Sequence, residues 1–242
     1  IYRKICLSIR QKRAVLYEPV LDKNEVEILK KCINSGFVST AGKFVEKFEK
    51  KIIKLTKSEY AVAVVNGTAA LEIALKVSGV KQGDEVLVPS ITFVGSANAI
   101  SFANAMPHFI DSDLSNLGIC LDSLEIHLKK ISKINSNNEL INKYTGRKIK
   151  AVIPVHVYGN IINMDRLNYI SKRYKLTVIE DAAEAIGSYY KSKHAGTLGT
   201  IGIISFNGNK LITTGGGGII LTNKKILADK AKHLSNVSKV DH

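Results

Sequence analysis

Residues 205–218 decide how the rest of this chain is interpreted; they have the sequence SFNGNKLITTGGGG. One lysine, Lys210, lies there between an apolar segment at 201–206 and four consecutive glycines at 215–218. A second apolar segment follows at 219–222, so we predict two strands joined by a turn that carries the lysine. A lysine enclosed at such a turn loses its proton readily and can attack a carbonyl carbon. A solvated hairpin lysine has the same local pattern, so other residues must decide between the two interpretations.

Strand-like and helix-like segments alternate along most of the chain. Short apolar runs predict buried strands, and these runs are 61–65, 85–89, 109–111, 150–157 and 177–179. Helical spacing or composition predicts helices at 43–56, 68–75, 121–131 and 164–174, with a further one ending near Ser101. The alternation predicts an α/β fold in which a mostly parallel central sheet is flanked by helices. The polar, Asn-rich stretch 133–148 is predicted to be a surface loop.

The first predicted helix has recognisable ends. Asp22 precedes Glu25 by three residues, which is the spacing of a capping box, and Gly36 is a natural stop. We therefore predict a helix that runs from just after Asp22 to about Ser35.

Polar and aromatic residues recur at or just after the ends of predicted strands. They are Gly67, Thr68, Phe93, His156, Asp181 and Ser205. In sheets of this kind, ligands bind beyond the carboxyl ends of the strands. We therefore expect one site at that edge, with Lys210 beside it.

The triplet Asn66-Gly67-Thr68 separates a predicted strand from a predicted helix. The backbone N–H groups at such a helix start point outward, Gly67 permits close approach, and the Thr68 hydroxyl can donate, so the triplet is typical of a phosphate cradle. An ordinary N-cap formed by Thr68 remains the alternative.

Composition narrows the class of protein. The chain has 242 residues, 45% hydrophobic and 23% charged, which is enough apolar material for one large folded unit. The formal net charge of +14 favours anionic partners, but the lysines are dispersed, so phosphorylated small ligands fit better than nucleic acid. Cys6, Cys32 and Cys120 are widely spaced, which favours a reduced, cytoplasmic setting. No apolar run reaches the ~18 residues of a membrane span.

The strand-end residues have the chemistry of a pyridoxal 5′-phosphate site. Such a site needs a lysine that bonds to the cofactor, a carboxylate that keeps the pyridine nitrogen protonated, an aromatic ring over one face and a phosphate cradle. Lys210, Asp181, Phe93 and the Gly67-Thr68 turn supply these four parts.

The order and spacing of these motifs resemble the DegT/DnrJ family of sugar aminotransferases. The matching segments are NGTAAL at 66–71, PSITF at 89–93, EDAAE at 180–184, and Ser205-Phe206 with Lys210. The stretch 205–218 is most similar to the branch that aminates 4-keto nucleotide sugars for legionaminic-type acids and bacillosamine. The resemblance runs from about Glu18 to the last residue.

The resemblance implies a role for each matched residue. Lys210 would be the Schiff-base lysine and proton carrier, and Asp181 would pair with the pyridine nitrogen. Phe93 would stack on the ring. The phosphate would bind at Gly67, Thr68, Ala69 and Ser205. His156 matches a strand-end histidine near the cofactor, where a purely structural histidine is an equal alternative.

Two positions depart from the pattern of the family. Glu184 stands where many members have Gln or His on the O3′ side of the cofactor, and we count it among the cofactor-binding residues. Gly216 stands where many relatives have Glu, so the structural role of that glutamate is missing.

The resemblance also implies an activity and an organisation. The expected enzyme is a homodimeric aminotransferase that converts a 4-keto-6-deoxy nucleotide sugar to its 4-amino sugar, with glutamate as donor, for bacterial surface glycans. Residues 1–17 would form an N-terminal segment and 18–242 the large, cofactor-binding domain. The smaller C-terminal domain of the family is not found in this sequence, so we expect the 242-residue chain to turn over little substrate alone.

Three other interpretations are weaker. A non-catalytic basic α/β module that binds nucleic acid, or holds the cofactor as a regulator, would not need Lys210. A P-loop NTPase lacks support because no Gly-Lys-Ser/Thr pattern follows a strand. Related dehydratases carry histidine where this chain has Lys210. No metal site is predicted.

Overall fold

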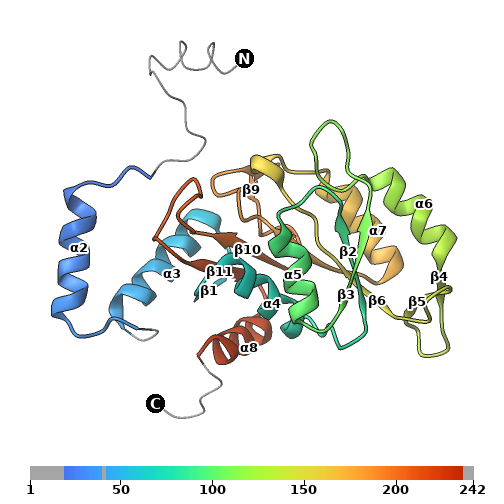
Figure 1. The fold of residues 1–242 in the computed structure, drawn as a ribbon, viewed down its shortest axis with the longest axis horizontal. Helices are drawn as coiled ribbons and strands as arrows, with labels where there is room; N and C mark the ends of the chain where they lie inside the picture. The colour runs from blue at the N-terminus through green and yellow to red at the C-terminus, as the bar shows by residue number, and fades with distance from the viewer. Residues whose placement is uncertain (1–18, 40–41, 237–242) are drawn as a thin grey trace.

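The computed structural model describes residues 19–39 and 42–236 (Figure 1). Cys6 and the whole of the expected segment 1–17 therefore lie outside the described residues. The first described helix, α2 (Lys23–Asn34), begins with the predicted capping box: the Asp22 N–H donates to Glu25 Oε2 at 2.7 Å, and the Asn24 N–H donates to Asp22 Oδ1 at 2.7 Å. The predicted start of this helix is confirmed.

A seven-stranded sheet forms the centre of the molecule, in the order β1-β11-β10-β7-β6-β2-β3. The strands are β1 (Tyr60–Val64), β2 (Glu85–Pro89), β3 (Met106–Ile110), β6 (Ile149–Val152), β7 (Thr177–Asp181), β10 (Ile201–Ser205) and β11 (Gly218–Thr222). β11 pairs antiparallel with β1 and β10, and the other neighbours are parallel. The prediction of a mostly parallel sheet is confirmed.

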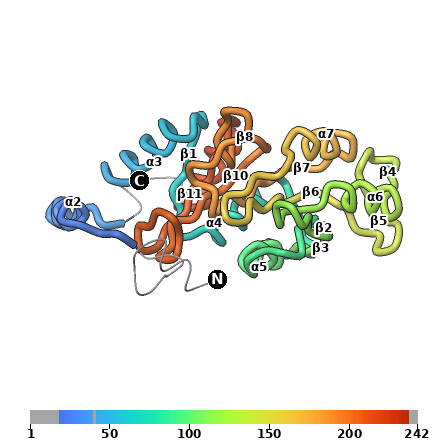
Figure 2. Tube along the Cα trace, turned by 90° about the horizontal axis from the view of Figure 1, so that it is seen from above, coloured from blue at the N-terminus to red at the C-terminus, as the bar shows by residue number. Residues whose placement is uncertain are grey.

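Helices cover both faces of this sheet, as Figure 2 shows along the edge. One face is covered by α4 (Gly67–Val77), α5 (Val94–Phe102) and α8 (Lys225–Ser235), whose alanines and leucines share one buried cluster with the sheet. The other face is covered by α6 (Leu121–Ile131) and α7 (Met164–Tyr174), and by α3 (Lys43–Thr56), which packs Ile52 against the antiparallel end of the sheet. One apolar cluster on the first face and two on the other pack the helices against the sheet and hold the strand ends in place.

The short elements lie outside the main sheet. They are β4 (Ser132–Ile134), β5 (Leu140–Asn142), η1 (Val157–Gly159), β8 (Tyr189–Tyr190) and β9 (Lys193–His194). β4 and β5 pair antiparallel, so the stretch 133–148, predicted to be a loop, is in part a small hairpin. Leu140 and Asn142 are buried, and Asn142 Nδ2 donates to Glu85 Oε2 at 2.9 Å, which attaches the hairpin to the sheet.

Candidate functional site

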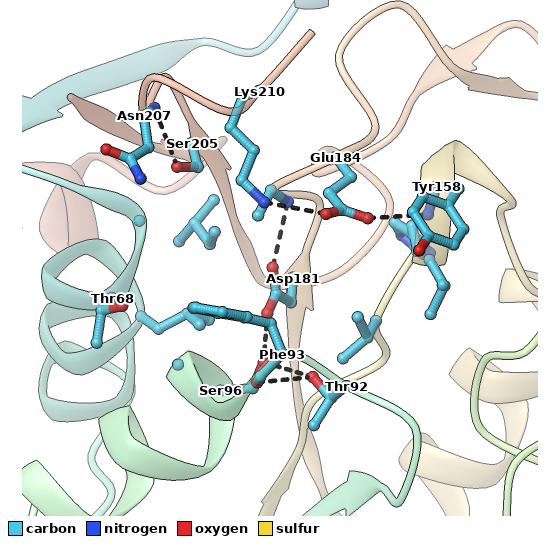
Figure 3. A pocket seen from close by; sticks show the side chains of 18 of the residues that line it. Thr68, Thr92, Phe93, Ser96, Tyr158, Asp181, Glu184, Ser205, Asn207 and Lys210 are labelled. Atoms are coloured by element: carbon cyan, nitrogen blue, oxygen red, sulfur yellow. Dashed lines mark hydrogen bonds and ion pairs between the residues drawn. The ribbon is translucent and has the colours of Figure 1, made fainter. Parts of the chain in front are cut away.

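A cavity of about 630 Å³ opens at the carboxyl edge of the parallel strands (Figure 3). The start of α4, the turn before α5, and the loops after β6, β7 and β10 form its walls. The residues predicted from strand ends that line it are Gly67, Thr68, Phe93, His156, Asp181, Glu184, Ser205 and Lys210. Side chains far apart in the sequence therefore meet in one place, as the topology of the sheet predicts.

Lys210 lies in the turn after β10, where its N–H donates to the Asn207 carbonyl at 3.0 Å. Its side chain is only 12% exposed and turns into the cavity, where Nζ donates to Glu184 Oε1 at 3.0 Å. Nζ also lies 5.9 Å from the centre of the Phe93 ring. This geometry disfavours the interpretation of Lys210 as a solvated lysine in a hairpin.

Glycines make the turn around Lys210 possible. Gly215 has φ +83°, and Gly217 has φ +156°, both in the region that favours glycine. A Cβ on Gly218 would lie 2.5 Å from the Asn66 carbonyl oxygen, so only glycine lets the return strand approach the start of α4.

Asp181 is the last residue of β7 and lies at the bottom of the cavity, 5% exposed. Its carboxylate accepts from Ser96 Oγ at 2.6 Å and from the Ala183 N–H at 3.2 Å. Burial raises the pKa of Asp181, although both hydrogen bonds and the nearby cations Lys210 and His156 act in the opposite direction. A further cation beside this carboxylate would relieve the cost of burying its charge.

Glu180, next to Asp181, turns into a different environment. It is fully buried and accepts from the N–H groups of Gly196 at 2.9 Å and Leu198 at 2.6 Å, and also from Gly199. Its Oε2 lies 3.0 Å from His156 Nε2. All of these partners belong to the protein, which indicates a structural role for Glu180.

His156 connects this buried network to the cavity. Its side chain is buried and lines the cavity, with Nε2 occupied by Glu180. Among the residues that the structure describes, Nδ1 has no hydrogen-bond partner. A buried ring nitrogen without a partner is costly and fits a position beside a polar ligand.

The N-cap of α4 is not Thr68, as the alternative interpretation of the Asn66-Gly67-Thr68 triplet expected. Asn66 is the N-cap, and its Oδ1 accepts from the Ala69 N–H at 2.8 Å. Thr68 is left to line the cavity, whereas Ala69 is not in the lining and its N–H is already bonded. A Cβ on Gly67 would lie 2.9 Å from Ser205 Cβ, so Gly67 brings the helix start against the end of β10. The Ser205 and Thr68 hydroxyls and the α4 N-terminus thus face one corner.

Glu184 is held at both oxygens. Oε1 pairs with Lys210, and Oε2 accepts from the Tyr158 N–H at 3.1 Å. Tyr158 has φ 51°, so the backbone in η1 is turned to present this N–H to the cavity.

Sequence reasoning missed Thr92, Ser96, Asn207 and Tyr158 as cavity residues. Thr92 Oγ1 lies 2.7 Å from Ser96 Oγ, so the two hydroxyls form a chain that leads to Asp181. A weak signal was present, because Ser96 is a polar residue one helical turn after Phe93 in the largely apolar segment 94–102.

These residues fit the pyridoxal 5′-phosphate that the sequence resemblance implies. The cavity offers a lysine amine, a buried carboxylate with a raised pKa, an exposed aromatic ring and a helix start with two hydroxyls. A buried Nδ1 without a partner adds a polar contact. Within 19–39 and 42–236, no group of three or more His, Cys, Asp or Glu residues could hold a metal ion.

No helix in the described part of the chain is long and apolar enough to cross a membrane.

Comparison with known proteins gives consistent matches. The model of the DegT/DnrJ/EryC1/StrS aminotransferase family matches residues 19–242. The chain is 40% identical over 218 residues to GDP-perosamine synthase of Escherichia coli O157:H7, covering 90% of this chain and 55% of that protein. An aminotransferase structure from Psychrobacter cryohalolentis matches with a TM-score of 0.79 at 29% identity, covering 93% of this chain and 56% of that one. The chain spans about half the length of the curated relatives it matches.

Proposed function

The chain belongs to the DegT/DnrJ/EryC1/StrS aminotransferase family, and on this premise we propose that the whole protein is a pyridoxal 5′-phosphate-dependent nucleotide-sugar aminotransferase. The observation that carries the proposal is that Lys210 Nζ, the buried carboxylate of Asp181 and the N-terminus of α4 with the Thr68 and Ser205 hydroxyls line one cavity. A non-catalytic module would not need a nucleophilic amine enclosed beside a carboxylate with a raised pKa.

Each of several cavity residues has a separate role in the proposed reaction. When bound, pyridoxal phosphate supplies an electron sink for negative charge at the reacting carbon. Lys210 would hold the cofactor and would move a proton at Nζ, and Asp181 would hold the pyridine nitrogen in its protonated form. Ser96 orients the Asp181 carboxylate by its hydrogen bond to Oδ2. Phe93 would contact the cofactor ring.

The phosphate binds at the start of α4 in this proposal. The helix N-terminus favours an anion, and the hydroxyls of Thr68 and Ser205 can donate to phosphate oxygens. Gly67 and Ala69 belong to the same turn, but the Ala69 N–H donates to Asn66. Gly67 therefore acts through close approach, and Ala69 acts by completing the turn.

The substrate is proposed to be a nucleotide-linked 4-keto-6-deoxy sugar, with glutamate as amino donor and surface-glycan synthesis as the context. Names of the relatives support GDP as the nucleotide. The formal net charge of +14 suits attraction of a sugar linked to a diphosphate. We further propose a cytoplasmic homodimer, with residues 18–242 acting as the large, cofactor-binding domain.

The test of the proposal is an isotope experiment on the whole protein. It is incubated with pyridoxal phosphate, glutamate labelled with ¹⁵N at the amino group, and a panel of nucleotide-linked 4-keto-6-deoxy sugars. Mass spectrometry should detect a 4-amino sugar that carries the label, and Lys210→Ala should form none. Cofactor binding without labelled amino sugar from any panel member would favour the non-catalytic module instead.

A further inference from the structure

The two oxygens of the Glu184 carboxylate have separate tasks in the structure. Oε2 accepts from the Tyr158 N–H at 3.1 Å, which ties Glu184 to the loop after β6. Oε1 accepts from Lys210 Nζ at 3.0 Å. The side chains of Lys210 and Glu184 are 12% and 26% exposed, so this pair is partly shielded from water. Figure 3 shows the carboxylate between the lysine amine and Tyr158.

Asp181 is the other carboxylate that lines the cavity, and it is differently engaged. Its Oδ2 accepts from Ser96 and its Oδ1 from the Ala183 N–H. Within the described residues, Glu184 is the only hydrogen-bond acceptor in contact with Lys210 Nζ. Glu184 is therefore in direct contact with the reacting nitrogen, whereas the hydrogen bonds of Asp181 go to Ser96 and Ala183.

We propose that Glu184 is the proton acceptor for covalent capture of the cofactor by Lys210. This inference rests on the proposed function, because it assumes an aldehyde ligand in the cavity. A lysine nitrogen that carries three protons has no lone pair with which to attack a carbonyl carbon, so one proton must leave Nζ before the bond can form. Transfer of one proton from Nζ to Glu184 Oε1, along the existing hydrogen bond, frees the lone pair.

The step balances without another reactant. The Nζ lone pair forms a bond to the aldehyde carbon, the C=O π electrons pass to oxygen, and a second Nζ proton moves to that oxygen. Glu184 then returns its proton to the hydroxyl, which leaves as water while nitrogen and carbon form a double bond. The nitrogen keeps one proton and the positive charge, and Glu184 is again a carboxylate.

Glutamine at this position would separate the two tasks. An amide has one oxygen and one NH₂ group, so only one of the two positions that the carboxylate oxygens occupy, beside Tyr158 N–H and beside Lys210 Nζ, can still accept. If the oxygen stays with Tyr158, the NH₂ group faces Lys210 and cannot take a proton. Glu184→Gln therefore preserves the tie to the loop and removes the base.

The experiment follows capture directly rather than turnover. Apo-protein of the full chain is mixed with pyridoxal 5′-phosphate in a stopped-flow instrument, and the absorbance change that accompanies bond formation is recorded. We expect Glu184→Gln to slow capture roughly 10²-fold at neutral pH, the low end for loss of a general base. Glu184→Asp, which keeps a carboxylate, should retain part of the rate. The Gln variant should recover as pH rises, because solution bases then take the proton.

Two controls separate this role from a structural one. Pyridoxine 5′-phosphate has an alcohol in place of the aldehyde, so its affinity reports the shape of the site without bond formation, and Glu184→Gln should weaken this affinity by a much smaller factor than it slows capture. Glu139→Gln changes another glutamate that pairs with a lysine, Lys148 at 2.6 Å, but lies outside the cavity. That variant should capture the cofactor at the wild-type rate.

The possible outcomes distinguish failure of this inference from failure of the proposed function. Wild-type capture rates in Glu184→Gln overturn the inference and leave the proposed function intact. Equal losses of capture and of pyridoxine 5′-phosphate affinity also overturn it, because Glu184 then only shapes the site. If the wild-type chain binds pyridoxine 5′-phosphate but never bonds to pyridoxal 5′-phosphate, the proposed function itself fails and the inference fails with it.

Discussion

Two buried carboxylates lie at opposite ends of the strands of the same sheet, Glu85 at an amino end and Asp181 at a carboxyl end, and their hydrogen-bond partners differ. Glu85, the first residue of β2, accepts from Asn142 Nδ2 at 2.9 Å, His108 Nδ1 at 2.9 Å and Thr145 Oγ1 at 2.5 Å. Burial pushes the pKa of Glu85 upward, but these three hydrogen bonds outweigh it and the pKa is lowered. At the carboxyl edge, burial prevails and the pKa of Asp181 is raised.

The difference shows how a structural carboxylate can be told from one that awaits a ligand. Glu85 accepts from three donors within the protein and is not among the residues that line the cavity at Asp181. Asp181 has two donors, lines that cavity and lies near His156, whose Nδ1 has no hydrogen-bond partner within the described residues. We infer that removing the charge from Asp181 harms function, whereas removing it from Glu85 harms stability.

The largest effect is expected at Asp181. Asp181→Asn should lower transamination by the whole protein at least ~10²-fold, because the pyridine nitrogen loses its anionic partner. The pKa of Asp181 is raised, so its charged form costs the apo-protein stability at neutral pH, and the Asn variant should unfold at the same or higher urea concentration. An Asp181→Asn variant with full transamination activity, or one that unfolds at a much lower urea concentration, would contradict the proposed difference between Asp181 and Glu85.

Glu85→Gln should show the reverse pattern. The amide cannot accept all three donors as strongly, and we expect a loss of about 2 kcal/mol in the free energy of unfolding, within the range for hydrogen bonds to charged groups. Pyridoxine 5′-phosphate affinity should be unchanged, because Glu85 lies at the far edge of the sheet. Urea denaturation and a binding titration check both halves, and a weakened affinity at native stability would count against the comparison.

A smaller effect on stability is expected from replacing His127, which is connected to Glu85 through His108. His108 Nε2 lies 2.7 Å from His127 Nε2, and Lys130, Asp111 and Glu85 are the other charged groups near the His127 ring. Burial, then the charges of His108 and Lys130, lower the pKa of His127, with Asp111 and Glu85 opposing. The unfolded chain therefore binds a proton first as pH falls below about 6.5, and stability is lost from there through the lower folded pKa.

His127→Gln should consequently flatten the fall in stability between about pH 7 and 5. The pKa of His194 is also lowered by burial, so that residue contributes a slope of the same sign in both proteins and serves as the internal reference. Denaturation midpoints measured across this range test the point; parallel curves for wild type and variant would contradict it.

The smallest effect is expected at an exposed pair. Lys225 Nζ lies 2.8 Å from Asp229 Oδ2, but the side chains are 70% and 61% exposed. Solvent screens such a pair, so Asp229→Asn should leave the urea midpoint unchanged within error. A clear shift here would show that the stability assay does not isolate burial as the decisive variable.

The sequence predicted most of the fold because local patterns determine it. Apolar spacing predicted α3, α6 and α7 with the bounds that the structure has, and strand ends predicted where the cavity forms. The β4–β5 hairpin was missed because its attachment depends on Asn142 reaching Glu85, 57 positions away. Ser96 was missed as a partner of Asp181 for the same reason, since 85 positions separate them. Polar contacts between residues far apart in the chain produce almost no periodic pattern in the sequence.

The central claim is that Lys210 and Asp181 form a cofactor site at the carboxyl edge, and borohydride trapping tests it most directly. The chain is incubated with pyridoxal 5′-phosphate, reduced with borohydride, digested and mapped by mass spectrometry. We predict a visible absorbance band that disappears on reduction, with the added mass on the peptide that contains Lys210. Label spread over exposed lysines, or an unchanged pattern in Lys210→Ala, would contradict it.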